Sequence, residues 1–168
     1  MREPVFGPSD PAASRNDVFT LYLDSFRSRI IEGVEGLSES EVRRSRLASG
    51  WTPLELVKHL TYVELRWLEW GFEGQDVPDP WGDRRDDRWY VAANESRNDV
   101  IAALNAQAVR SRSIIESNEL SAVAQPGPRF KDGEPPTLER ILLHLLQEYA
   151  HHLGHLDIVV EIATAQDV

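Results

Sequence analysis

The last part of the chain carries an apolar stripe of helical period that limits what the chain can fold into. The stripe begins after Thr137, continues to about Ala163, and contains Leu138, Leu142, Leu145, Tyr149, Leu153, Leu156 and Val160. Residues three or four apart share one side of an α-helix, so this spacing predicts a long amphipathic helix. Such a helix has to bury its stripe against other elements, which favours a helical domain.

Three earlier stretches have the same period, at residues 14–35, 52–72 and 95–118. The second begins with Thr52-Pro53 and Glu55, which combine an N-cap, a proline in the first turn and a capping-box glutamate. The apolar stripes predicted for the three helices are, in order, Val18, Leu21, Tyr22, Ser25, Phe26, Arg29 and Ile30; Leu56, Leu60, Val63 and Trp67; and Val100, Leu104, Ala108, Ile114 and Ile115. No strand-like alternation of useful length occurs. The sequence therefore predicts an all-α four-helix bundle.

The remaining segments complete one predicted domain, residues 1–168, with an extended lead-in at residues 1–13. Two segments, 74–90 and 119–136, are long enough for crossover connections. The first contains Trp81 and Trp89, which are interpreted either as packing residues or as part of a lid over a pocket. The Asp/Arg run at 83–88 is interpreted as a mixture of solvated charges.

Composition excludes several classes of function. A net charge of −10 argues against general nucleic-acid binding, which depends on basic side chains. No stretch approaches the ~18 apolar residues that a membrane span needs, and the N-terminus lacks an apolar signal core. The sequence has no cysteine, so a metal would be held by nitrogen and oxygen atoms. These features favour a cytoplasmic protein without a membrane or nucleic-acid partner.

Histidines gather on the predicted C-terminal helix. Four of the five histidines lie between residues 144 and 155, with Glu148 among them. Positions 144, 148, 151, 152 and 155 fall on one side of the helix, and imidazoles with a carboxylate are ligands that borderline divalent metals select. The spacing of four residues allows two chelating pairs, Glu148 with His152 and His151 with His155.

The fifth histidine, His59, is the natural third ligand because it lies on the predicted helix 52–72. Three protein ligands with one open position are typical of a catalytic metal site. The apolar stripe places Glu148 and His152 closer to the core than His144 and His151, so geometry favours the first pair. The chain lacks the His-Glu-x-x-His motif, which argues against a zincin protease.

Two strings resemble a known family. Thr52-Pro-Leu-Glu-Leu-Val-Lys-His59-Leu-Thr-Tyr-Val-Glu64 is followed by Glu148-Tyr-Ala-His-His152-Leu-Gly-His155-Leu-Asp157. Their order and spacing resemble the DinB/YfiT-like superfamily, and most closely its branch of mycothiol-dependent enzymes. The resemblance implies a four-helix bundle with a divalent metal, zinc or nickel, bound by His59, Glu148 and His152.

The same resemblance implies a thiol-dependent transferase or isomerase that joins a low-molecular-weight thiol such as mycothiol to a small electrophile. His155, Asp157 and Glu64 are then expected as catalytic residues, the first two as pocket groups and Glu64 as a support of the site across the bundle. His144 and His151 are expected to be bystanders. The resemblance also implies a homodimer. Two other functions remain open, a metal-dependent hydrolase and a non-catalytic metal-binding module of a stress response.

Overall fold

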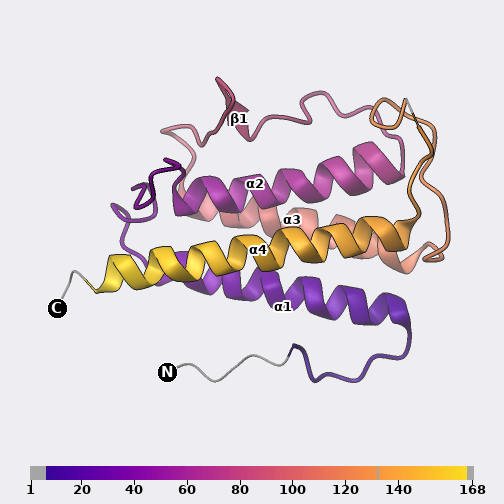
Figure 1. The fold of residues 1–168 in the computed structure, drawn as a ribbon, viewed down its shortest axis with the longest axis horizontal. Helices are drawn as coiled ribbons and strands as arrows, with labels where there is room; N and C mark the ends of the chain where they lie inside the picture. Colours follow the sequence, from indigo (N-terminus) through magenta and orange to yellow (C-terminus); the bar gives the residue numbers. More distant parts are fainter. Residues whose placement is uncertain (1–6, 132, 166–168) are drawn as a thin grey trace.

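The computed structural model of the protein describes residues 7–131 and 133–165, and four long helices dominate it. The helices are α1 (Arg15–Glu35), α2 (Pro53–Trp67), α3 (Arg97–Glu116) and α4 (Leu138–Thr164). They run along one axis, with α4 packed against α1 and α2 (Figure 1). The predicted four-helix bundle is confirmed. Residues 7–13 of the predicted lead-in have no helix or strand, and residues 1–6 lie outside the described part.

Hydroxyl side chains fix where the helices begin. Each of the four helices follows a serine or threonine whose side-chain oxygen accepts a hydrogen bond from a backbone N–H of the first turn, at Ser14, Thr52, Ser96 and Thr137. In the first three helices an acidic side chain completes a capping box. These bonds satisfy amides that have no partner inside the helix, and they explain why the helix starts were predictable from sequence.

The core is built from all four helices, and three of the predicted stripes lie in it. The stripe predicted for α1 was correct only in its second half, where Ile30 is buried and Phe26 packs against the core. Val18 and Tyr22 are 43% and 38% exposed, whereas Phe19 and Leu23 are buried. The buried side of α1 includes Arg27, which is only 3% exposed. Because Arg27 is charged, the sequence did not indicate that this side of α1 is buried.

The connection between α2 and α3 runs back along the bundle, so these two helices point in the same direction (Figure 1). The connection between α3 and α4 stays at one end of the bundle, so only the first of the two long loops is a crossover. Within the crossover, β1 (Arg84–Arg85) pairs with β2 (Arg88–Trp89) as a short antiparallel hairpin that the sequence did not predict. Its two turn residues, Asp86 and Asp87, have positive φ values of 51° and 58°. This is the backbone twist of a tight hairpin turn.

The predicted second helix has the expected length but changes its winding. Its last residues, Leu68–Phe72, form a π-helical turn, in which the backbone makes wider hydrogen-bonded rings than an α-helix. The backbone N–H of Gln125 donates to the carbonyl of Phe72 at 2.8 Å and ties the α3–α4 loop to this turn. Among the described residues, no helix is long and apolar enough to cross a membrane.

Candidate metal centre

The three predicted metal ligands lie together in the middle of the bundle. His59 on α2 faces Glu148 and His152 on α4, and one donor atom from each lies within 4.8 Å of the others. Glu148 and His152 are one helical turn apart, and Nε2 of His152 lies 3.3 Å from a carboxylate oxygen of Glu148. The cluster therefore follows directly from the spacing on α4 and from the packing of α4 against α2.

Asp83 holds His59 in one orientation. Its Oδ2 lies 2.9 Å from Nδ1 of His59, and its other oxygen accepts a hydrogen bond from Arg66 at 2.6 Å. Because Nδ1 faces Asp83, the Nε2 atom of His59 is the one left for a ligand role. Burial lowers the pKa of His59, although Asp83 opposes the shift, so the imidazole is neutral near pH 7.

The burial of Asp83 corrects the interpretation of the segment 83–88 as solvated. Its neighbours Arg84 to Arg88 are exposed as expected, but Asp83 is 0% exposed. Burial alone raises the pKa of Asp83, but hydrogen bonds from His59 and Arg66 outweigh it and lower the pKa overall. The sequence held one signal for this residue. Arg66 lies seven positions after His59, on the same side of α2, and a charge there requires an acidic partner.

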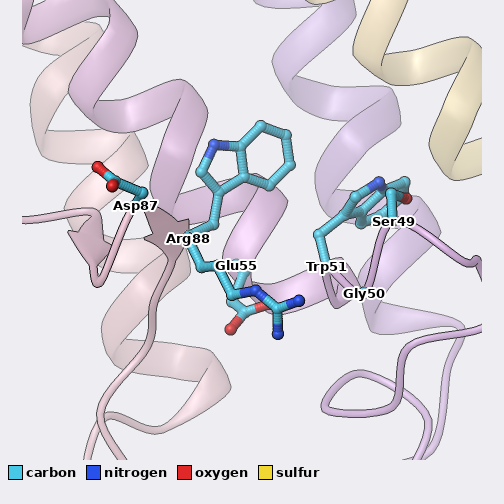
Figure 2. A pocket seen from close by; sticks show the side chains of 7 residues that line it. Ser49, Gly50, Trp51, Glu55, Asp87 and Arg88 are labelled. Atoms are coloured by element: carbon cyan, nitrogen blue, oxygen red, sulfur yellow. The ribbon is translucent and has the colours of Figure 1, made fainter.

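Aromatic rings close one side of the cluster. The ring of Trp89 stacks on His59 with centroids 4.1 Å apart, and it meets the edge of His152 at 5.3 Å. The ring centroid of Trp51 lies 6.0 Å from that of Trp89 and 6.3 Å from that of His155. Beyond them is a hollow of about 270 Å³ between the segment at Trp51 and the hairpin at Arg88 (Figure 2). Of the two predicted alternatives for Trp89, the structure supports packing over the site.

A second hollow adjoins two of the three predicted ligands. A hollow of about 320 Å³ is lined by Glu148, His152, His144, Gln147 and His151. His144 was expected to be a bystander, but it contacts a predicted ligand. Its Nε2 lies 3.3 Å from a carboxylate oxygen of Glu148, and its ring centroid lies 4.2 Å from that of Trp67. His151 is exposed. The carboxylate of Glu148 is half-buried, and its pKa is lowered by the hydrogen bond with His152 and then by the charge of His144.

The structure places the three predicted catalytic residues in different surroundings. His155 lies at the edge of the cluster, with its ring 5.9 Å from His152, and burial followed by the nearby histidines lowers its pKa. Asp157 is exposed and pairs with Arg29 at 3.3 Å. Glu64 is fully buried, where it accepts hydrogen bonds from Arg27, Ser111 and Tyr149. Because Tyr149 directly follows Glu148 on α4, Glu64 supports the cluster only through the packing of the bundle.

The residues present fit a borderline divalent metal. Two neutral imidazoles and one carboxylate are the donor set that zinc selects, and bonds of about 2.1 Å in a tetrahedral site would separate the donors by about 3.4 Å. The observed donor separations, within 4.8 Å, approach this value. Among the described residues Nδ1 of His152 is also buried without a hydrogen-bond partner, which identifies the cluster as polar and incompletely satisfied.

The fold and the cluster define a class of helical-bundle protein with a three-residue site suited to metal. The sequence model of the mycothiol-S-transferase family matches residues 18–165, and the chain belongs to this family. The resemblance to the DinB/YfiT-like superfamily is confirmed.

The fold is shared by the solved structure of YfiT from Bacillus subtilis, which is described as a probable metal-dependent hydrolase with an unusual four-helix bundle topology. It is 17% identical, with a TM-score of 0.62 over 92% of this chain and 90% of that chain. This likeness concerns the fold alone. No curated protein matches the sequence significantly.

Proposed function

We propose that the protein is a divalent-metal-dependent S-transferase that joins a low-molecular-weight thiol, mycothiol first among them, to a small electrophile. The observation that carries the proposal is the convergence of His59, Glu148 and His152 beside an open hollow in a chain of the mycothiol-S-transferase family. The sequence contains no cysteine, so a sulfur nucleophile has to come from a co-substrate. Zinc is the proposed metal, and nickel suits the same donors.

The three ligands of the proposal are one carboxylate and two imidazoles. A divalent ion bound there supplies a Lewis acid that lowers the pKa of a thiol, so that the thiolate forms near neutral pH. Asp83 holds the tautomer of His59 that leaves Nε2 free, and the stacked indole of Trp89 excludes water from that side. The hollow beside Glu148 and His152 admits the small molecules.

The reaction requires a proton acceptor for the thiol. His155 is the proposed acceptor because its lowered pKa keeps the imidazole neutral, and because its ring lies 5.9 Å from His152. The S–H bond breaks as His155 takes the proton, the sulfur forms a bond to the electrophilic carbon, and the leaving group departs with the electron pair of its bond. Asp157 and Glu64, which the sequence also suggested as catalytic, take no part in this proposal. The expected homodimer and cytoplasmic location stay predictions.

Elemental analysis of the purified protein tests the metal. Wild type should contain about one zinc or nickel per chain, whereas His59→Ala and His152→Ala should contain far less. His151→Ala is the matched control, since it removes an exposed histidine from the same helix. Equal metal content in wild type and His152→Ala would contradict the assignment of the ligands.

Thiol consumption tests the reaction. Mycothiol, bacillithiol and glutathione are each mixed with 1-chloro-2,4-dinitrobenzene, and formation of the thioether is followed with zinc-loaded and chelator-treated protein. The proposal expects zinc-dependent turnover with at least one thiol. The alternative function is a metal-dependent hydrolase, as YfiT is described. Zinc-dependent hydrolysis of an ester or amide without any thiol would favour that alternative.

A further inference from the structure

An arginine with no recorded ion pair to a described residue lies in the loop between α3 and α4, near the candidate metal centre. The guanidinium of Arg129 stacks over Trp67, with its central carbon 4.1 Å from the ring centroid, and it lies 5.4 Å from the ring of Trp70 and 5.7 Å from that of Phe130. Its Nε atom is buried without a hydrogen-bond partner, and among the described residues no carboxylate lies within 4.0 Å of it. Within residues 7–131 and 133–165, the recorded partners of this cation are the three aromatic rings.

The bundle is shaped to receive this side chain. Gly71 lies in the π-helical turn, and a Cβ there would be 3.0 Å from Cδ of Arg129, 3.0 Å from the carbonyl oxygen of Arg66 and 3.2 Å from the ring of Phe130. The loop itself is fixed, because the backbones of Gly74 and Gly127 pack so closely that a Cβ on Gly127 would lie 2.7 Å from Cα of Gly74. Gly74 also has a positive φ of 65°, which favours glycine.

The electrostatics of Arg129 are unusual for an arginine. Burial, followed by the like charge of Arg66, lowers its pKa to about 10. The charge of Arg66 is already compensated by Asp83. Arg129 therefore stays charged near neutral pH, and a partly desolvated cation without an anion gains free energy when an anion binds.

Two contacts connect Trp67, on which Arg129 stacks, to the candidate metal centre. Trp67, beneath the guanidinium, lies 4.2 Å from His144, and His144 lies 3.3 Å from Glu148. A hollow of about 330 Å³ is lined by Trp67, His144 and Gln147, and the hollow at Glu148 shares the last two of these residues. A small molecule in these hollows would thus lie along α4 between Glu148 and Trp67, the ring on which Arg129 stacks.

We propose that Arg129, on its support of Trp67, Trp70 and Phe130, is a binding site for a carboxylate group of the small-molecule substrate. The proposal deepens the proposed function, because it adds a substrate class, acidic aromatic or unsaturated compounds, to the same site. The planar guanidinium offers two parallel N–H donors to a carboxylate, and the indole surface suits an adjacent flat apolar group. Arg129 acts as a specificity residue and does not touch the reacting atoms.

Benzoate and benzamide are the probes that test this site, because they differ only in the charged group. Their binding to chelator-treated protein is measured by isothermal titration calorimetry without thiol, so the result does not depend on turnover. Benzoate should bind wild type, and benzamide should bind roughly tenfold to hundredfold more weakly, as expected for the loss of a charged hydrogen bond. Equal binding of the two, or no binding of benzoate at millimolar concentrations, overturns the proposal.

Variants locate the site. Arg129→Met keeps the apolar stem on Trp67 but removes the charge, and Gly71→Ala keeps Arg129 but crowds its Cδ, together with the carbonyl oxygen of Arg66. Both should weaken benzoate binding by roughly tenfold or more, with circular dichroism verifying the fold. The matched control is Arg140→Gln, which removes an exposed cation that lines the hollow at Trp67. Loss of binding in this control and not in Arg129→Met overturns the proposal.

Two further outcomes separate the proposal from competing explanations. Benzoate that binds only zinc-loaded protein would be a metal ligand, and this result overturns the assignment to Arg129 while leaving the proposed transferase intact. Asp132→Asn removes the acidic residue nearest to Arg129 along the chain. Its benzoate affinity should equal that of wild type, and a higher affinity would mean that Asp132 already occupies the arginine.

Discussion

Glu64 and Glu148 are both glutamates on the inner side of a helix, and their surroundings differ. Glu64 is fully buried and accepts four hydrogen bonds, two from Arg27 and one each from Ser111 and Tyr149. These occupy the lone pairs of the carboxylate. Glu148 is half-buried, and its ion-pair partners in the described part of the chain are His144 and His152, each at 3.3 Å. A saturated carboxylate holds helices together, whereas an unsaturated one beside two imidazoles retains the capacity to bind a ligand.

The Glu64 cluster should give the largest effect on stability. Glu64→Gln keeps the volume but leaves the buried Arg27 without its main counter-charge, so the free energy of unfolding should fall by about 3–5 kcal/mol. Urea unfolding of metal-free protein measures this. Asp157→Ala, which breaks the exposed pair with Arg29, is the control and should cost at most about 1 kcal/mol. Similar losses in both variants would mean that Glu64 is not a structural residue.

The candidate metal centre should affect stability only when metal is present. At a free zinc concentration about 100 times the dissociation constant, wild type should gain about 2.7 kcal/mol in the free energy of unfolding. His152→Ala should gain little, because one of three ligands is missing. His151→Ala should behave as wild type. The measurement is urea unfolding with and without buffered zinc, and a full gain in His152→Ala would contradict the proposed site.

Asp83 resembles Glu64 in being buried and paired with an arginine, but it also orients His59, a candidate metal ligand. Asp83→Asn should weaken zinc affinity by about 10- to 100-fold, because His59 loses the carboxylate that fixes its tautomer. Competition with a chromophoric chelator measures the affinity. Asp87→Asn is the control, because it changes an exposed residue of the same hairpin and asparagine tolerates a positive φ. An unchanged affinity in Asp83→Asn would remove Asp83 from the site.

The smallest expected effect is the loss of the stabilisation by Asp83 in acid. The pKa of Asp83 lies below its ordinary value of 3.8, because hydrogen bonds from His59 and Arg66 outweigh burial. The folded protein therefore binds fewer protons at this carboxyl than the unfolded chain, so the stabilisation is complete above pH 3.8 and is lost as the pH falls through the folded pKa. In unfolding of the metal-free proteins, wild type should therefore lose more stability than Asp83→Asn as the pH falls below 3.8. Parallel pH profiles would contradict it.

The same comparison explains what the sequence could predict. Glu148 and His152 share one helix, so their separation follows from the helical repeat, and His59 follows from the stripe of α2. Glu64 was expected to be catalytic because of the resemblance. Its structural role could not be read from local spacing, because Arg27, which pairs with it, lies on another helix 37 residues away. Asp83 was assigned to a solvated run because its burial depends on the path of the crossover, which local spacing does not determine. Helix periodicity thus predicts sites within elements better than contacts between a loop and a helix.

The hairpin at the metal centre restricts how the length of the crossover can vary between relatives. Loops usually tolerate insertions and deletions, but successive residues of a strand point to opposite faces. One residue added between Asp86 and Asp87 would change the register in which Arg84 pairs with Trp89. The indole that now stacks on His59 would then face away from it. Relatives that keep an aromatic ring at this place are therefore expected to keep the two-residue turn, and length changes should accumulate elsewhere in the crossover.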